Sequence, residues 1–190
     1  MGLWDTLTGR TKPVKANLDA LFSLPTASIT LQTAASFQPT GTGAVCFRAA
    51  EGAAFAETQH DIVELLDSDE HGPDVESSTD SFGFTWLLSR QDPDDISVLV
   101  NDLHAVNTTL EAQGFGPSLL CSIVGFTDAA GRKLGLVYLY KRGTFYPFCP
   151  QDGQRRDNLL EIQVRDLVKN DLPVEADVSR WMPVWGAPGL

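Results

Sequence analysis

The chain has 190 residues, and its 25 acidic side chains outnumber its 14 lysines and arginines, which gives a net charge of −11. A chain of this length can bury a hydrophobic core without disulfide or metal staples. Its acidity disfavours nucleic acid as a partner, because phosphate binding needs a positive field. No apolar run approaches the roughly 18–20 residues that cross a bilayer, and no secretory signal pattern is visible. Together with three widely spaced cysteines, this favours a reduced, cytoplasmic protein.

The acidic residues are concentrated in residues 51–80, which contain no lysine or arginine. The acids in this stretch are Glu51, Glu57, Asp61, Glu64, Asp67, Asp69, Glu70, Asp74, Glu76 and Asp80. Residues 1–15 and 131–170 are instead net basic. Two interpretations remain open for the acidic stretch: a solvated loop that raises solubility, or a docking surface for a basic partner.

The first fifteen residues predict a short amphipathic helix followed by a basic linker. The apolar side chains share one helical face, and the bases follow within one or two turns. The candidate partner or membrane contacts are Leu3, Trp4, Leu7, Arg10, Lys12 and Lys15. The apolar residues would enter a membrane interface while the bases meet anionic headgroups. Packing of this helix on the body of the protein is the alternative.

The next segment predicts short elements. Asn17 can cap a short helix that Pro25 stops. Alternating apolar residues then predict a strand over residues 27–33. A turn at residues 39–41 leads into a second strand, residues 44–49.

The middle of the chain predicts two helices around one strand. Apolar residues in helical period predict a half-buried helix over residues 53–67, and residues 68–80 predict an acidic loop. Large apolar residues on both faces predict a central strand over residues 82–88. Asp92 and Pro93 suit the start of a long helix that Gly114 closes.

The last third predicts a meander and a helix. Strands are expected over residues 119–126, 133–140 and 144–149, with tight connections between them. A helix is expected over residues 155–169, with its arginines outward. The Trp- and Pro-rich tail, residues 181–185, is expected to lie across the body.

This order of elements predicts an α+β fold with a mainly antiparallel sheet and helices packed on it. Residues 16–190 form one domain in this interpretation, preceded by the helix and linker of residues 1–15. Each half of the chain has a hairpin followed by a helix. This similar order of elements leaves open two similar lobes, residues 16–67 and 81–190, joined by the acidic loop 68–80.

No catalytic, cofactor-binding or metal site can be assigned from motifs. Asp67–Gly72 matches the start of a calcium loop, but the later ligand positions are not filled by suitable residues. His60, with Glu57 and Glu64 one turn away on either side, is interpreted as a solvated histidine. His104, beside an apolar stripe, is interpreted as a half-buried packing residue.

The three cysteines receive two interpretations. Cys46 and Cys121 lie in apolar strands and are expected to pack in the core. Cys149 lies between a phenylalanine and a proline, nearer to a predicted surface turn. It is therefore the cysteine singled out for a test of reactivity.

Several segments without chemical meaning of their own resemble a known family. They are Met1-Gly2-Leu3-Trp4-Asp5, Gly9-Arg10, Lys12-Pro13-Val14, Asn17–Phe22, Ala44–Phe47, Tyr138–Phe148 and Arg180–Gly186. Together they are similar to the PspA-associated protein family PspAB, which occurs in phage-shock-type gene neighbourhoods of actinobacteria and archaea. The resemblance implies a cytoplasmic accessory protein of the envelope stress response around PspA, a coiled-coil membrane-remodelling protein. It brings no catalytic residues.

The leading hypothesis is therefore a non-catalytic adapter that acts with a PspA-like protein near the inner membrane face, without a cofactor. A homodimer is compatible with it. A chaperone-like module that binds a peptide or protein is the second hypothesis, and a small-molecule enzyme of unknown chemistry is the third.

Overall fold

The computed structural model describes residues 16–67 and 74–190. Its helices, including single 3₁₀ turns labelled η, are η1 (Leu18–Ser23), α1 (Leu24–Ala35), α2 (Ala53–Asp67), α3 (Ile96–Ala112), η2 (Gly116–Ser118), α4 (Asn158–Val168) and η3 (Val178–Arg180). Its strands are β1 (Gln38–Arg48), β2 (Glu76–Thr79), β3 (Phe84–Arg90), β4 (Leu119–Thr127), β5 (Lys133–Leu139), β6 (Thr144–Phe148), β7 (Pro150–Gln151) and β8 (Arg155–Arg156). The predicted α+β class is confirmed.

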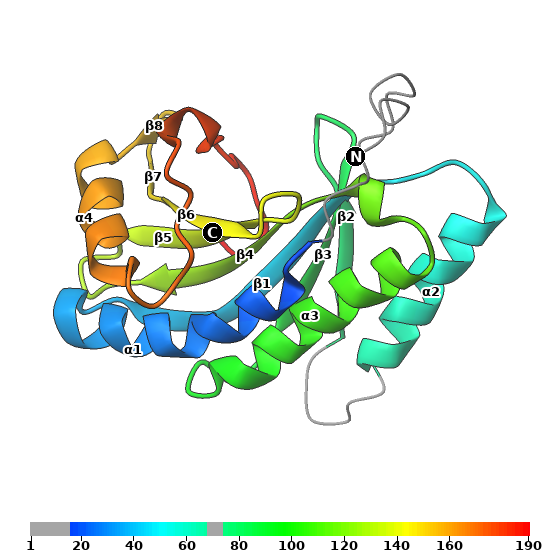
Figure 1. Cartoon of the computed structure of the whole chain (residues 1–190), viewed down its shortest axis with the longest axis horizontal. Helices are drawn as coiled ribbons and strands as arrows, with labels where there is room; N and C mark the ends of the chain where they lie inside the picture. Colours follow the sequence, from blue (N-terminus) through cyan, green and yellow to red (C-terminus); the bar gives the residue numbers. More distant parts are fainter. Residues whose placement is uncertain (1–15, 68–73) are drawn as a thin grey trace, which may run out of the picture.

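Six strands form one antiparallel sheet in the order β2-β3-β1-β4-β5-β6. The long strand β1 lies in the middle, and α3 connects its two neighbours, β3 and β4 (Figure 1). β1 comes from residues 16–67, whereas both of its neighbours come from residues 81–190. The two stretches therefore share one sheet and do not form separate similar lobes.

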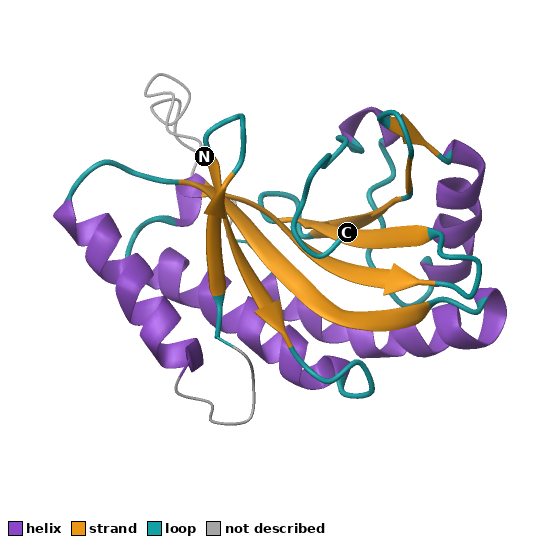
Figure 2. Cartoon of the chain, turned by 180° about the vertical axis from the view of Figure 1, so that it is seen from behind, coloured by secondary structure: helices purple, strands orange, loops and turns teal. Residues whose placement is uncertain are grey.

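One face of the sheet is covered by helices and the other by the C-terminal segment. α1 and α3 lie behind the sheet in Figure 2, and the end of the chain, residues 181–190, lies across its near face. Alternate residues of β1 serve the two layers: Val45 and Phe47 join the helix-side core, whereas Cys46 faces the tail. Trp181 and Ala187 are buried on that second face, which confirms that the tail lies across the body.

The strand predicted over residues 27–33 is wrong, because these residues belong to α1. The buried residues of α1 are Leu24, Ala27, Ser28 and Leu31, which is a helical spacing. Ile29, half of the apparent alternation, is 63% exposed. Pro25 stands in the first turn, where its missing N–H costs nothing, so it starts this helix instead of ending one.

The turn predicted at residues 39–41 is also wrong, since β1 runs through it. The register of β1 against β4 shifts between Pro39 and Gly43, and Gly41 adopts a positive φ of 71°. A Cβ atom at Gly41 would lie 2.2 Å from the carbonyl oxygen of Gln91. The proline and glycine therefore mark a bulge in a long strand.

The acidic loop predicted over residues 68–80 is only partly a loop. Residues 76–79 form the edge strand β2, all of whose residues are exposed, and residues 68–73 lie outside the described part. A strand without apolar residues carries no periodic signal, because nothing on either of its faces is buried.

Two helix starts are displaced from their predicted positions. α3 is capped by Asp95, whose carboxylate accepts a hydrogen bond from the Ser97 N–H, and Asp92 lies in the preceding turn. α4 is capped by Asp157, and the arginines before it form β8, paired with β7. The other predicted strands and helices are confirmed with boundary shifts of a few residues.

Candidate functional site

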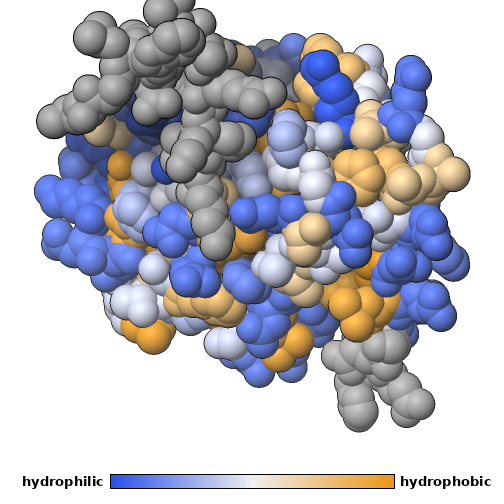
Figure 3. All heavy atoms as spheres, turned by 45° about the vertical axis from the view of Figure 1, so that its right-hand side comes forward, coloured by the Kyte–Doolittle hydropathy of each residue, from blue (hydrophilic) through white to orange (hydrophobic). Residues whose placement is uncertain are grey.

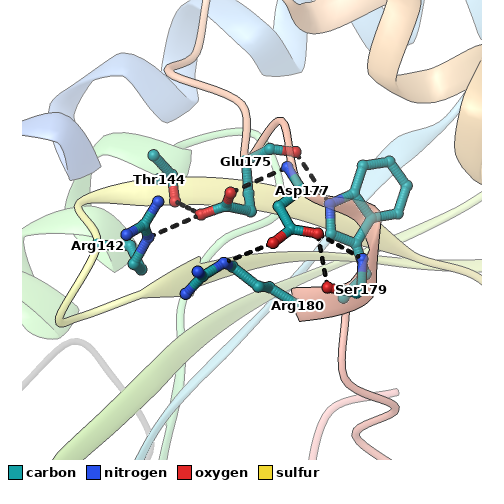
Figure 4. A network of polar contacts seen from close by, with 7 residues as sticks. Arg142, Thr144, Glu175, Asp177, Ser179 and Arg180 are labelled. Atoms are coloured by element: carbon teal, nitrogen blue, oxygen red, sulfur yellow. Dashed lines mark hydrogen bonds and ion pairs between the residues drawn. The ribbon is translucent and has the colours of Figure 1, made fainter.

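A network of hydrogen bonds around buried carboxylates lies where the C-terminal segment, residues 170–190 and below called the tail, meets β6 and α4. Glu175 is 2% exposed and sits at the centre of this network (Figure 4). Its carboxylate accepts hydrogen bonds from Arg142 Nε at 3.1 Å, from the Thr144 hydroxyl at 3.0 Å and from the Asp177 N–H at 3.0 Å. Burial alone would raise the pKa of Glu175, but these donors together hold it below its usual value.

The backbone around Glu175 continues the sheet. The Glu175 N–H donates to the Phe145 carbonyl at 2.7 Å, and the Phe145 N–H donates to the Pro173 carbonyl at 2.8 Å. The tail thereby covers the free edge of β6. The Trp181 indole N–H donates to the Glu175 carbonyl at 3.0 Å, which links this edge to the tryptophan on the sheet face.

A second buried glutamate, Glu161 of α4, is also 2% exposed. It accepts hydrogen bonds from Arg156 Nε and from the Cys149 N–H, both at 2.9 Å. Arg156 also donates to the Trp181 carbonyl and lies over the Phe148 ring. Glu161 and Glu175 therefore both anchor the tail, and their charges are already compensated.

Neither glutamate was singled out from the sequence. Glu161 shares the buried stripe of α4 with Val164 and Val168. An acidic residue on an apolar helix stripe is the sequence feature that could have pointed to it. Glu175 lies in a segment without helical or strand periodicity, and nothing in the sequence marks it.

A cavity of about 400 Å³ opens beside the anchored tail. Its lining includes Trp185 of the tail, Phe148 of β6, Arg132 of the β4–β5 connection and Asp157 at the start of α4. Arg132 is paired with Asp128 at 2.7 Å, and Asp157 caps α4. The charged groups named here already have partners within the protein, so they indicate no particular ligand.

The interpretation of Cys149 as a surface cysteine is wrong. Cys149 is 1% exposed in the helix-side core, and burial raises the pKa of its thiol. A raised pKa disfavours the thiolate, which is the reactive form. Tertiary packing causes the burial of Cys149, because α4 and the β7–β8 hairpin fold back over the end of β6. Cys46 and Cys121 are buried, as expected.

The histidines occupy the predicted environments. His60 is exposed on α2, together with Glu57 and Glu64. His104 packs its ring 4.7 Å from that of Phe22, with Nε2 3.7 Å from a carboxylate oxygen of Asp19. In residues 16–67 and 74–190, no three metal-ligating side chains come together. The calcium-loop match falls largely on residues 68–73, outside the described part.

The family model of PspA associated protein B matches residues 1–189. The chain belongs to this family. No curated protein and no solved structure matches it. The match covers nearly the whole chain of this PspAB member, including the residues of the anchored tail.

The predicted contact residues of this PspAB member, from Leu3 to Lys15, all lie outside the described residues. The described chain begins at Ala16, and the Asn17 carbonyl accepts a hydrogen bond from the Tyr138 hydroxyl at 2.9 Å. In the described part, no helix is long and apolar enough to cross a membrane.

Exposed apolar side chains of the body come from several elements. The largest are Phe22, Ile29, Leu65, Phe82, Leu159, Val178 and Met182. Figure 3 shows the end of the molecule that carries α2, where hydrophobic patches are interspersed with hydrophilic side chains. No single apolar groove dominates the view, so this face by itself does not identify a partner.

Proposed function

We propose that this chain is a non-catalytic accessory protein that binds a PspA-like protein near the inner membrane face during envelope stress. The observation that carries the proposal is the match to PspA associated protein B over residues 1–189. The name of that family indicates association with PspA. The chemistry of the body is in keeping with an adapter, because its two buried glutamates serve to hold the tail.

The N-terminal residues are the proposed point of contact. Leu3, Trp4 and Leu7 supply apolar area, and the bases from Arg10 to Lys15 supply positive charge in an otherwise acidic protein. Such a segment suits either an acidic helical partner or an anionic membrane surface. An apolar segment this short binds a membrane weakly, so a partner or oligomer would strengthen the contact.

Co-purification with a PspA-like protein and flotation with anionic liposomes test this proposal. The variant Leu3→Asp/Trp4→Asp should lose binding in at least one assay, because two apolar side chains of the proposed contact become charged. Leu159→Asp is the matched control, since Leu159 is 71% exposed on α4 and is not part of the proposed contact. The proposal is abandoned if wild type behaves like an unrelated acidic protein in both assays.

A chaperone-like module remains the second candidate, and β2 is the observation that favours it. All four residues of this edge strand are exposed, and an open edge can accept an extended peptide. Replacing Ser78 by lysine should block such pairing and leave contact through the N-terminal residues intact. The same co-purification therefore separates the two candidates.

A further inference from the structure

Two buried cysteines lie directly opposite each other in the centre of the sheet. Cys46 of β1 and Cys121 of β4 are Cα partners in an antiparallel register. Both face the tail side and belong to the same buried cluster. The side chains of Cys46 and Cys121 lie close enough to influence each other electrostatically.

This arrangement meets the geometric requirement for a disulfide. Opposite residues in antiparallel strands have Cα atoms about 4.5–5.5 Å apart, and disulfides span about 4.4–6.8 Å. The register of β1 against β4 shifts immediately after the pair, because Phe47 is opposite Leu119. The extra residue in β4 places the cysteines at the end of a regular ladder, where the backbone can adjust to a new bond.

Cys149 cannot take part without unfolding. It belongs to the helix-side core, whereas Cys46 and Cys121 lie on the opposite side of the sheet. The sheet itself separates the third thiol from the pair. The three cysteines are therefore one facing pair and one thiol that lies apart from it.

We propose that Cys46 and Cys121 are a redox modification site, which a hydroperoxide converts reversibly into an intramolecular disulfide. One thiol first attacks the peroxide and becomes a sulfenic acid, with release of one water when the oxidant is hydrogen peroxide. The second thiol then attacks that sulfur, which forms the S–S bond and releases a second water. The two electrons lost by the two sulfurs reduce the peroxide.

The surroundings assign the order of the two steps. The neighbouring Cys121 side chain, followed by burial, raises the pKa of the Cys46 thiol. Cys121, the more exposed of the two at 8% against 3%, is the thiol that the peroxide reaches first. Burial of both thiols makes the reaction slow compared with that of an exposed cysteine.

Peptide mapping of the full-length protein tests the site directly. Trypsin cleaves after Lys15, Arg48, Arg90 and Arg132, and again after Arg142 and Arg155. Cys46, Cys121 and Cys149 thus fall on three different peptides: 16–48, 91–132 and 143–155. After treatment of the folded protein with hydrogen peroxide and blocking of free thiols, peptides 16–48 and 91–132 should be joined, and dithiothreitol should release them.

The oxidised protein should also melt about 5–10 °C higher, because the bond closes a long loop in the unfolded chain. Cys149→Ala should keep both the cross-link and this shift, whereas Cys46→Ala and Cys121→Ala should each lose both. Circular dichroism confirms that each variant is folded. Three results overturn the proposal: no cross-link in folded Cys149→Ala, a cross-link that contains Cys149 or joins two chains, or irreversible oxidation of Cys121 alone. The test is independent of binding to a PspA-like protein.

Discussion

Glu175 holds more polar contacts than its place in an irregular tail suggests. Arginine, hydroxyl and backbone donors all converge on one carboxylate that is 2% exposed. Removing the charge leaves these donors without an ionic acceptor in a buried site, and such a loss typically costs about 1–3 kcal/mol. Arg142 itself has a 48% exposed side chain and can turn to water, so the cost should fall in the lower part of that range.

Glu175→Gln should therefore lower the free energy of unfolding by about 1–2 kcal/mol at neutral pH. Since the pKa of Glu175 is lowered in the folded protein, the unfolded chain binds its proton more readily. The stabilisation is present above the unfolded pKa, near 4.3, and is lost as pH falls through the folded value. Urea denaturation at several pH values should show the difference between variant and wild type shrinking below about pH 4.

A surface ion pair provides the control for this prediction. Asp166 contacts Arg165 at 2.9 Å, but its side chain is 51% exposed. Asp166→Asn should change stability by less than about 0.5 kcal/mol. Equal effects of the two substitutions would show that Glu175 is no more than another surface charge.

At the scale of elements, caps and bulges decide where helices and strands begin. Three acids, Asp92, Asp94 and Asp95, lie just before α3, and only the backbone decides which of them caps it. Asp95 has the non-helical backbone of a cap, with φ of −122°, and its carboxylate accepts a hydrogen bond from the Ser97 N–H at 3.2 Å. Asp92 instead accepts from Asp94 N–H in the turn before the helix.

Asp95→Ala should consequently destabilise the protein by about 1 kcal/mol, the usual cost of a lost N-cap. Asp92→Ala removes the same charge three residues earlier and should cost clearly less. Thermal denaturation of the two variants under identical conditions measures the difference. If Asp92→Ala were the more destabilising variant, Asp92 would be the N-cap of α3, as the sequence predicts.

At the scale of the molecule, the C-terminal segment completes the fold. It runs beside β6, where Val174 forms a parallel bridge with Phe145. It then places Trp181 on Tyr146, with ring centroids 6.1 Å apart. It ends at β1, where the Thr42 hydroxyl donates to the Gly189 carbonyl at 3.1 Å. The tail thus joins the edge of the sheet to its centre and buries its second face.

Trp181→Ala should therefore cost about 3–5 kcal/mol, as for other large-to-small substitutions in a core. Trp185→Ala is the matched comparison, because Trp185 is only half-buried and touches Phe148 edge-on. Its loss should cost less than half as much. Urea unfolding followed by circular dichroism avoids the change in tryptophan fluorescence, and similar effects would contradict the role given to the tail.

The sequence determined those features that depend on neighbours along the chain. The helix over residues 53–67, the β4–β5–β6 meander and the α+β class follow from periodicity and from turn residues. The family could also be recognised, because its motifs run from the first residues to the tail. Burial of Cys46 and Cys121 followed from their apolar strands.

Only the tertiary structure decided which faces are buried by distant parts of the chain. Two alternating apolar residues in α1 predict a strand, because local alternation does not show that this segment packs against α3 and α4 as a helix. Cys149 is buried because α4 packs against β6. Glu175 is a centre of contacts because Arg142 and Thr144 meet it from another strand end. The Cys46–Cys121 pair depends on the register of β1 against β4. Each of these contacts joins residues that are far apart in sequence, and local pattern carries no information about register or about which segment will cover a face.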